Sequence, residues 1–244
     1  MCETSTKVFI LEVMGRNAGW IAASSGLAAA GELDPPHVIL FPEIGFHRQT
    51  FMAKVQNSVK RDGYCVVVAS EGARYPNGSL IAESSDKDAF GHQQLGGVAP
   101  ALAEMIRKDL GYKHHWAKAD YLQRSARHIS STVDVEHAFA VGQEAVEKAL
   151  EGESSIMITI ERNTDKEYRW SLGTVSLSQV ANKEKLLPID FISPDGFSIT
   201  KEAREYLLPL IRGESYPLYS GGLPQYAKLK NKLTPKKLLN PFEL

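Results

Sequence analysis

The chain has 244 residues, which is enough for one large α/β domain or two smaller ones with a substantial core. Its 28 lysines and arginines balance 29 acidic residues, so the net charge of −1 gives no strong field to attract nucleic acid or an anionic membrane. No apolar stretch approaches the roughly 18 residues that a membrane-spanning helix needs. The two cysteines, Cys2 and Cys65, predict no disulfide framework and no cysteine metal site, which fits a reducing cytoplasm.

Apolar runs alternate with amphipathic segments along the chain, as in a parallel sheet covered by helices on both faces. This alternation predicts an α/β fold. Strands are predicted over residues 8–14, 37–41, 64–69, 116–123 and 156–160, the last as a buried strand. Helices are predicted over residues 18–30, 48–61, 98–111, from 131 onward and between 200 and 213. Residues 72–97 have the composition of a long surface loop, and residues 216–244 are expected to run over the surface.

Side-chain periodicity indicates which helix faces are buried. Phe51, Val55 and Val59 share one face of the helix predicted over 48–61. Ser131 and Asp134 have the spacing of a capping box, which opens the next helix. The apolar face expected on that helix consists of Val135, Phe139, Gly142 and Val146.

The segment from Val13 to Trp20 combines a strand end, a glycine turn and the start of a helix rich in small residues. Gly15 lets backbone approach a ligand because it has no Cβ atom, and Asn17 is placed to accept hydrogen bonds from the first helical turn. Those amides carry the positive end of the helix dipole, and Arg16 adds a two-pronged donor for phosphate. The pattern predicts an anion-binding turn.

Met14-Gly15-Arg16 in this strand-turn-helix resembles the Met-Gly-Arg substrate motif of the 6-phosphofructokinases. Two further segments resemble that family in the same order. Ser70-Glu71-Gly72 follows an apolar strand, like the family's sugar-binding glutamate, and Tyr121-Leu122-Gln123-Arg124 resembles its next substrate segment. Residues 119–128 and 168–188, with the extended tail, are more similar to the pyrophosphate-dependent branch than to the short ATP-dependent bacterial enzymes.

The resemblance implies a division of chemical roles. Arg16 and Arg124 would contact phosphate oxygens, while Glu71 would accept hydrogen bonds from sugar hydroxyls. Arg16 would also lie near the transferring phosphoryl group, where a cation stabilises charge developing in the transition state. All three motifs follow predicted strands, and open α/β sheets bind ligands at the carboxyl ends of strands, so we expect them to converge. The implied substrate-binding residues are Met14, Gly15, Arg16, Glu71, Tyr121 and Arg124.

Taken one at a time, these residues have simpler interpretations. An isolated arginine after a strand is usually half of an exposed ion pair, and Glu71 alone could cap a helix or pair with Arg74. The order and spacing of the three motifs favour the functional interpretation. The adjacent His114 and His115 predict no metal site, because they would point to opposite sides of an extended segment. His115 does fall near a position where related enzymes have a basic residue.

The sequence departs from the family in one respect that concerns mechanism. The family's catalytic base lies in a Thr-x-Asp-x-Asp segment and its donor loop is a Gly-Gly-Asp-rich turn, both before the Met-Gly-Arg motif, and neither occurs here. Asp120 is therefore not predicted to be the base. We expect a phosphofructokinase-like two-domain subunit that lacks its amino-terminal donor-binding half, with no metal or cofactor site in this chain.

Three parts of that subunit are expected. Residues 1–123 would form part of the fructose 6-phosphate-binding domain, residues 124–181 would return to the phosphoryl-donor domain, and residues 182–244 would form a helical extension and tail. The returning segment should expose apolar faces that normally pack on the absent strands.

For the complete enzyme, the resemblance implies phosphoryl transfer to the 1-hydroxyl of fructose 6-phosphate, which gives fructose 1,6-bisphosphate in glycolysis. Pyrophosphate is favoured over ATP as donor, with Mg²⁺ shielding the donor oxygens, and the enzyme would be a homodimer or homotetramer. An ATP-dependent 6-phosphofructokinase and a non-catalytic sugar-phosphate-binding module stay open. A Rossmann-type dehydrogenase is disfavoured, because Gly15-x-x-x-Gly19 is not Gly-x-Gly-x-x-Gly.

Because the catalytic aspartate segment does not occur in the sequence, we expect the 244-residue chain alone not to catalyse transfer. An aldolase-coupled assay with fructose 6-phosphate and either pyrophosphate or ATP should give no rate above the blank. A complete enzyme of the family provides the positive control. Turnover with either donor would contradict this expectation.

Overall fold

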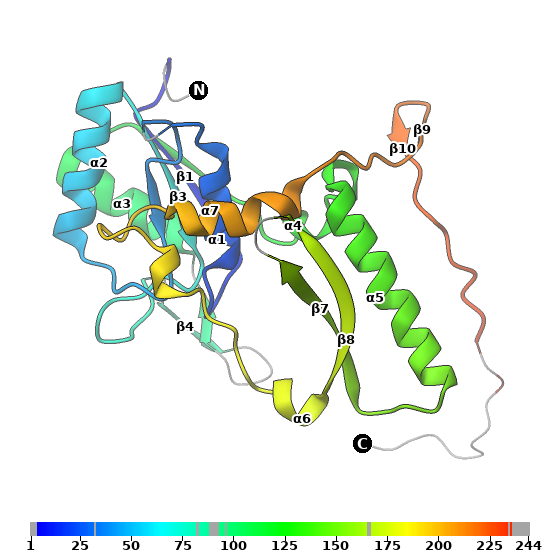
Figure 1. Ribbon diagram of the computed structural model, residues 1–244. Coiled ribbons are helices and arrows are strands. Elements are labelled where there is room, and N and C mark those ends of the chain that lie inside the picture. The colour runs from blue at the N-terminus through cyan, green and yellow to red at the C-terminus, as the bar shows by residue number, and fades with distance from the viewer. Residues whose placement is uncertain are drawn as a thin grey trace.

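The computed structural model describes residues 4–31, 33–81, 83–87, 93–95, 97–164, 167–233 and 235. Figure 1 shows two units side by side: an α/β unit, and a smaller unit in which a long helix packs on a two-stranded hairpin. No helix within the described residues is both long and apolar enough to cross a membrane. Cys2 lies outside the described residues, and Cys65 is a buried cysteine.

A parallel four-stranded sheet organises the α/β unit, which confirms the predicted fold class. Its strands are β1 (Val8–Val13), β2 (Val38–Leu40), β3 (Cys65–Ser70) and β6 (His114–Lys118), in the order β2-β3-β1-β6. All neighbouring pairs are parallel, with Val13 opposite Ser70 and Glu12 opposite Lys118. The inner strands are mostly buried on both faces, which explains their nearly continuous apolar sequences.

Helices cover both faces of this sheet, as the alternation of segments predicts (Figure 1). Helices α2 (Arg48–Asp62) and α3 (Val98–Leu110) pack on one face, where Phe51 and Val55 are fully buried as predicted. Helix α1 (Trp20–Ser25), the 3-10 turn η1 (Gly26–Ala28) and helix α7 (Lys201–Leu207) lie on the other.

Two predicted elements are wrong in extent. The helix expected over 18–30 is shorter, since it consists of α1 followed by η1. The strand expected over 116–123 ends at Lys118, because Asp120 adopts a positive φ of 47° and turns the chain into the short helix α4 (Leu122–Ser125), followed by the 3-10 turn η2 (Arg127–Ile129).

The expected loop over 72–97 also contains regular structure. It includes a short antiparallel hairpin of β4 (Glu83–Lys87) and β5 (Gln93–Leu95). Its residues 82, 88–92 and 96 lie outside the described part of the chain.

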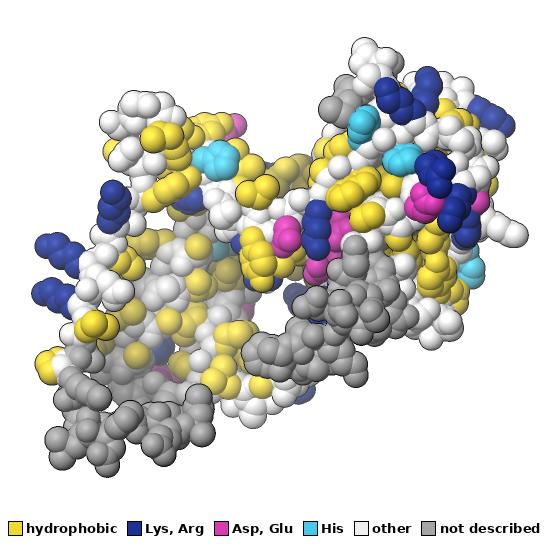
Figure 2. Space-filling view, turned by 180° about the vertical axis from the view of Figure 1, so that it is seen from behind, with side chains coloured by type: hydrophobic (Ala, Val, Ile, Leu, Met, Phe, Trp, Pro, Cys, Tyr) yellow, Lys and Arg dark blue, Asp and Glu magenta, His cyan; other side chains and the backbone are white. Residues whose placement is uncertain are grey.

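The second unit consists of α5 (Thr132–Leu150) and the antiparallel hairpin of β7 (Ile156–Thr164) and β8 (Arg169–Ser176). The predicted cap is confirmed, because Ser131 Oγ accepts a hydrogen bond of 3.0 Å from the Asp134 N–H. The predicted burial of the strand over 156–160 is wrong, because Ile160 is 42% exposed. Phe139 on α5 is 72% exposed, as expected of the apolar faces on the segment after Arg124. No described element covers these apolar faces, and hydrophobic side chains are visible on this unit in Figure 2.

The chain then returns to the α/β unit. Beyond α6 (Leu177–Val180), Leu187, Ile192 and Leu207 are buried against Ile39 and Val68 of the sheet. Thr200 Oγ1 accepts a hydrogen bond from the Ala203 N–H, which confirms the predicted start of α7. The remaining elements are η3 (Ile189–Phe191), η4 (Leu208–Ile211) and a short hairpin of β9 (Tyr219–Ser220) and β10 (Leu223–Pro224). Residues 225–233, which follow the hairpin, are exposed.

The exposed face of α5 should contribute to aggregation more than to folding stability. We expect Phe139→Ser with Val146→Ser to change the free energy of unfolding by no more than about 0.5 kcal/mol, because surface substitutions remove little buried area. Light scattering of the variant should fall below that of the unsubstituted chain. Leu102→Ala, at a fully buried position, should instead destabilise by about 2–5 kcal/mol in urea unfolding.

If the unsubstituted chain unfolded in urea as a cooperative monomer without aggregating, the exposed faces would not have the effect we assign to them.

Candidate functional site

The three motifs leave the same edge of three neighbouring strands. Met14 follows β1 and Glu71 follows β3, and the register pairs the last residues of these strands. Strand β6 lies on the other side of β1 and ends two residues before Asp120. The predicted position of the motifs at the carboxyl edge of the sheet is therefore correct.

Gly15 and Glu71 are in direct contact. The Gly15 N–H donates a hydrogen bond of 3.2 Å to Glu71 Oε1, and Ser70 Oγ donates to the Gly15 carbonyl. Gly15 has a φ of +139°, and a Cβ atom there would lie 2.8 Å from both Ser70 Oγ and the Ala18 carbonyl. Glycine is required at this turn because the protein's own atoms pack against it.

The backbone of Arg16 rests against Gly72. A Cβ atom on Gly72 would lie 1.8 Å from the Arg16 carbonyl oxygen, so only glycine fits. Arg74 Nη2 donates to that same carbonyl at 2.9 Å and to Asn17 Oδ1 at 3.2 Å. Arg74 thus fixes the backbone that carries Arg16, and it does not pair with Glu71 as the simpler interpretation suggested. The sequence feature that could have pointed to this role of Arg74 is its position, three residues after Glu71.

The expected role of Asn17 is wrong. Helix α1 begins after Gly19, and the Gly19 N–H donates a hydrogen bond of 2.9 Å to Glu43 Oε1 rather than to Asn17. Glu43 follows β2 at the same edge of the sheet, and a carboxylate is favoured at a helix N-terminus. The Asn17 amide instead donates to Glu184.

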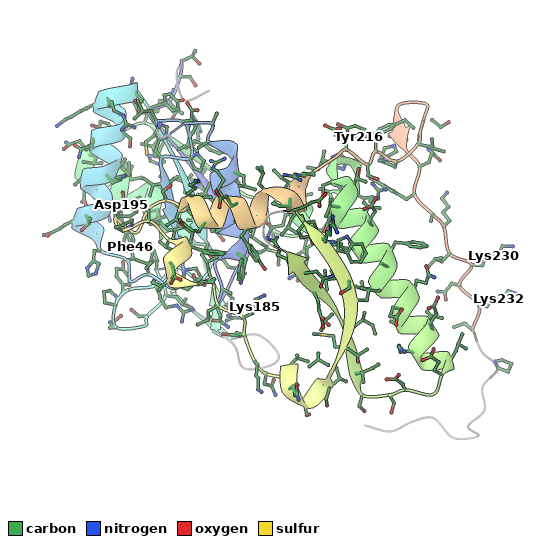
Figure 3. The ribbon with its side chains drawn as sticks, in the orientation of Figure 1. Phe46, Lys185, Asp195, Tyr216, Lys230 and Lys232 are labelled. Atoms are coloured by element: carbon green, nitrogen blue, oxygen red, sulfur yellow. The ribbon has the colours of Figure 1, made fainter. Side chains whose placement is uncertain are left out.

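A segment from the far end of the chain lies against this turn. Trp20 Nε1 donates to the Lys185 carbonyl at 2.7 Å, and the Leu187 N–H donates to Glu43 Oε1 at 2.9 Å. Figure 3 shows Lys185 on the segment that runs from α6 back to the α/β unit. These contacts hold residues 184–187 beside the turn that bears Arg16.

Tyr121 and Arg124 form a second group at the same edge. They lie on α4 and the residue before it, and the Arg124 guanidinium carbon is 5.4 Å from the centre of the Tyr121 ring. Tyr121 is 68% exposed, so both side chains are accessible to a ligand. The structure thus brings Gly15 into contact with Glu71 and the Arg16 backbone into contact with Gly72, and it places Tyr121 and Arg124 after the neighbouring strand β6.

The histidines form no metal centre. His114 and His115 lie on the edge strand β6, and the described residues contain no group of three or more histidine, cysteine, aspartate or glutamate side chains that could hold a metal ion.

A cavity lies elsewhere, at the amino edge of the sheet. It has a volume of about 330 Å³, is lined by Lys54, Arg61 and Arg204 among others, and includes none of the motif residues. His37 on its wall accepts a hydrogen bond from the Val66 N–H, and burial lowers the pKa of His37 in spite of nearby Asp62. The candidate site is defined by side-chain contacts rather than by this cavity.

The chain has a parallel sheet, with a glycine turn and arginine-bearing segments at the carboxyl edge of its strands. This arrangement is typical of α/β proteins that bind a ligand at that edge. The sequence model described as Phosphofructokinase matches residues 2–165, and the chain belongs to the phosphofructokinase family.

Two curated relatives show the degree of similarity. The pyrophosphate--fructose 6-phosphate 1-phosphotransferase of Halomonas elongata is 58% identical over 98% of this chain and 57% of its own length. That of Methylococcus capsulatus is 54% identical over 100% of this chain and 58% of its own length. This chain therefore spans less than two thirds of the length of these relatives.

A solved structure shows the same fold. The crystal structure of a pyrophosphate-dependent phosphofructokinase from Marinobacter aquaeolei has a TM-score of 0.86 and 57% sequence identity to this chain. The match covers 100% of this chain and 58% of that one. At this identity the likeness extends beyond the general α/β class to the arrangement of the individual elements.

The contact between Gly72 and Arg16 can be tested directly. We expect Gly72→Ala to destabilise the protein by about 1–3 kcal/mol, because the new methyl group forces the two turns apart. The matched control is Gly142→Ala on α5, where a Cβ atom meets nothing within 4 Å. That control should stabilise by about 0.5–1 kcal/mol, as alanine favours a helix.

Urea unfolding of the two variants measures both effects. Equal stability of Gly72→Ala and the unsubstituted chain would contradict the close approach of the two turns.

Proposed function

We propose that this chain provides the sugar-phosphate-binding part of a pyrophosphate-dependent 6-phosphofructokinase. The reaction transfers a phosphoryl group from pyrophosphate to the 1-hydroxyl of fructose 6-phosphate and gives fructose 1,6-bisphosphate. The observation that carries the proposal is the direct contact of Gly15 and Arg16 with Glu71 and Gly72, at the sheet edge that also presents Arg124. The names of the relatives support the choice of substrate and donor.

The two kinds of side chain at this edge suit the two parts of the substrate. Guanidinium groups of Arg16 and Arg124 bind phosphate oxygens through charge-assisted hydrogen bonds, which are stronger than neutral ones. Glu71 already accepts the Gly15 N–H on Oε1, and we assign its second oxygen to a sugar hydroxyl. The exposed phenol of Tyr121 adds a donor beside Arg124.

Arg16 has the larger part in the proposed chemistry. Its backbone is held by Gly72 and by the Arg74 guanidinium, so its side chain starts from a fixed point. A cation held in place beside the transferring phosphoryl group stabilises the transition state without a cost of reorganisation at the moment of reaction. Met14 and Gly15 shape the turn from which Arg16 projects.

Among the described residues, no group of three or more histidine, cysteine, aspartate or glutamate side chains could hold a metal ion. The work we propose for this chain is to bind and orient the sugar phosphate and to place the Arg16 charge. A cytoplasmic location and assembly into a homodimer or homotetramer complete the proposal, on the strength of the family alone.

Calorimetric titration with fructose 6-phosphate tests the binding role. Losing one charge-assisted hydrogen bond should cost about 1.5–3 kcal/mol, so we expect Arg124→Ala to weaken binding roughly 10- to 100-fold. The matched control is Arg107→Ala, which removes an exposed arginine on α3 that pairs with Glu104. The control should leave the affinity unchanged.

A second titration, with inorganic phosphate, separates the roles of the charged groups. Glu71→Gln should weaken fructose 6-phosphate binding but leave phosphate binding intact, because the carboxylate is assigned to the sugar. The proposal fails if the unsubstituted chain does not bind fructose 6-phosphate, or if Arg124→Ala and Arg107→Ala behave alike.

A further inference from the structure

A buried carboxylate lies directly beneath the candidate site. Glu12 is only 1% exposed, although it is two residues before Met14 on β1. Its side chain is on the face of the sheet that packs against α3. A buried acid on a central strand is costly unless its charge is compensated, so its surroundings explain its presence.

Glu12 joins three elements. Its Oε2 accepts a hydrogen bond of 2.9 Å from the Ala99 N–H in the first turn of α3, and its Oε1 lies 3.5 Å from Lys118 Nζ at the end of β6. Its main-chain carbonyl accepts a hydrogen bond of 3.1 Å from the Ala119 N–H. The side chain and backbone of one residue thus hold the end of β6 against β1 and α3.

Positive charge surrounds the Glu12 carboxylate. The N-terminus of α3 contributes the positive end of a helix dipole, and Lys118 contributes a full positive charge. Lys118 Nζ is also 3.9 Å from the Asp120 carboxylate, so this lysine connects Glu12 to the turn that precedes Tyr121.

That turn sets the direction of α4. Asp120 has a φ of 47°, the Leu122 N–H donates to the Ala119 carbonyl at 3.1 Å, and the Arg124 N–H donates to the Tyr121 carbonyl at 2.9 Å. None of the four residues of α4 is buried, so packing of its side chains contributes little to its placement. The contacts of Lys118 and Ala119 hold it to β1 on one side, and Arg127, just after it, donates to the Ser215 carbonyl on the other.

We infer that Glu12 is a positioning residue: its contacts with Lys118, Ala119 and α3 hold Tyr121 and Arg124 at the distance from Arg16 that a phosphorylated sugar requires. The inference rests on the proposed function for its ligand. Its structural part, the ordering of residues 119–125 by Glu12, stands on the contacts alone.

A double-variant cycle on fructose 6-phosphate binding tests the link to Arg124. Glu12→Gln keeps an acceptor for the Ala99 N–H but removes the charge opposite Lys118, and we expect it to weaken binding roughly 3- to 10-fold, since coupled neighbours interact by this order. Added to Arg124→Ala, it should cause a smaller further loss than it causes alone, because one of the two side chains it positions is gone. Added to Arg16→Ala, its effect should multiply.

Hydrogen exchange without ligand provides the second readout. Glu12→Gln should speed amide exchange in residues 119–125 while exchange in β3 stays unchanged. The matched control is Glu104→Gln, an exposed acid on α3 paired with Arg107 and Lys108, which should change neither exchange nor affinity. If Glu12→Gln unfolds the protein, Lys118→Gln, at a partly exposed position, replaces it with the same expectations.

The outcomes are distinguishable. If the unsubstituted chain does not bind fructose 6-phosphate, the proposed function fails, and exchange in residues 119–125 still decides whether Glu12 orders them. Unchanged exchange, or losses from Glu12→Gln that multiply equally with Arg124→Ala and Arg16→Ala, would overturn the positioning role.

Discussion

The close contact between the turns after β1 and β3 is the constraint on which the rest of the site depends. Neighbouring parallel strands bring their ends to one edge, but side chains normally keep the following turns apart. Here Gly15 and Gly72 remove that obstacle, and the Arg16 carbonyl takes the space that a Cβ atom on Gly72 would need. The backbone of Arg16 and the carboxylate of Glu71 are thereby fixed on adjacent turns.

Carboxylates satisfy backbone donors all along this edge of the sheet. Glu12 binds an amide of α3, Glu43 binds the amides of Gly19 and Leu187, and Glu71 binds the amide of Gly15. Anions of the protein itself therefore occupy donors that could otherwise serve a phosphate, including the start of α1. The positive charge available to a ligand comes from arginine side chains instead, which is why the proposed function depends on them.

Much of the α/β unit follows from local sequence. Apolar β-branched runs predicted its inner strands, and helical spacing predicted the buried face of α2, because both patterns reflect burial of the residues themselves. The position of Arg16, Glu71 and Arg124 at one edge followed in turn from their place after strands of a parallel sheet. Side-chain hydrogen bonds between distant segments were not predictable: Glu43 displaces Asn17 at α1, and nothing near Asn17 in sequence signals it. The prediction that β7 is buried was wrong for a related reason, because an apolar sequence pattern shows that a face is apolar but not what covers it.

The contacts of residues 184–187 tie the second unit to the turn that carries Arg16. Arg162 of β7 lies over the rings of Tyr168 and Tyr206 and donates a hydrogen bond of 2.6 Å to the Tyr206 carbonyl on α7, which joins the hairpin to the α/β unit at a second point. From β8 the chain passes through α6 to Lys185, whose carbonyl accepts the Trp20 side-chain N–H (Figure 3). The hairpin is therefore attached to the α/β unit through Arg162 at one end and through residues 184–187 at the other. Residues 177–183 connect β8 to the second of these attachments. The bonds of residues 184–187 thus both complete the core of the α/β unit and lie beside the Met-Gly-Arg turn.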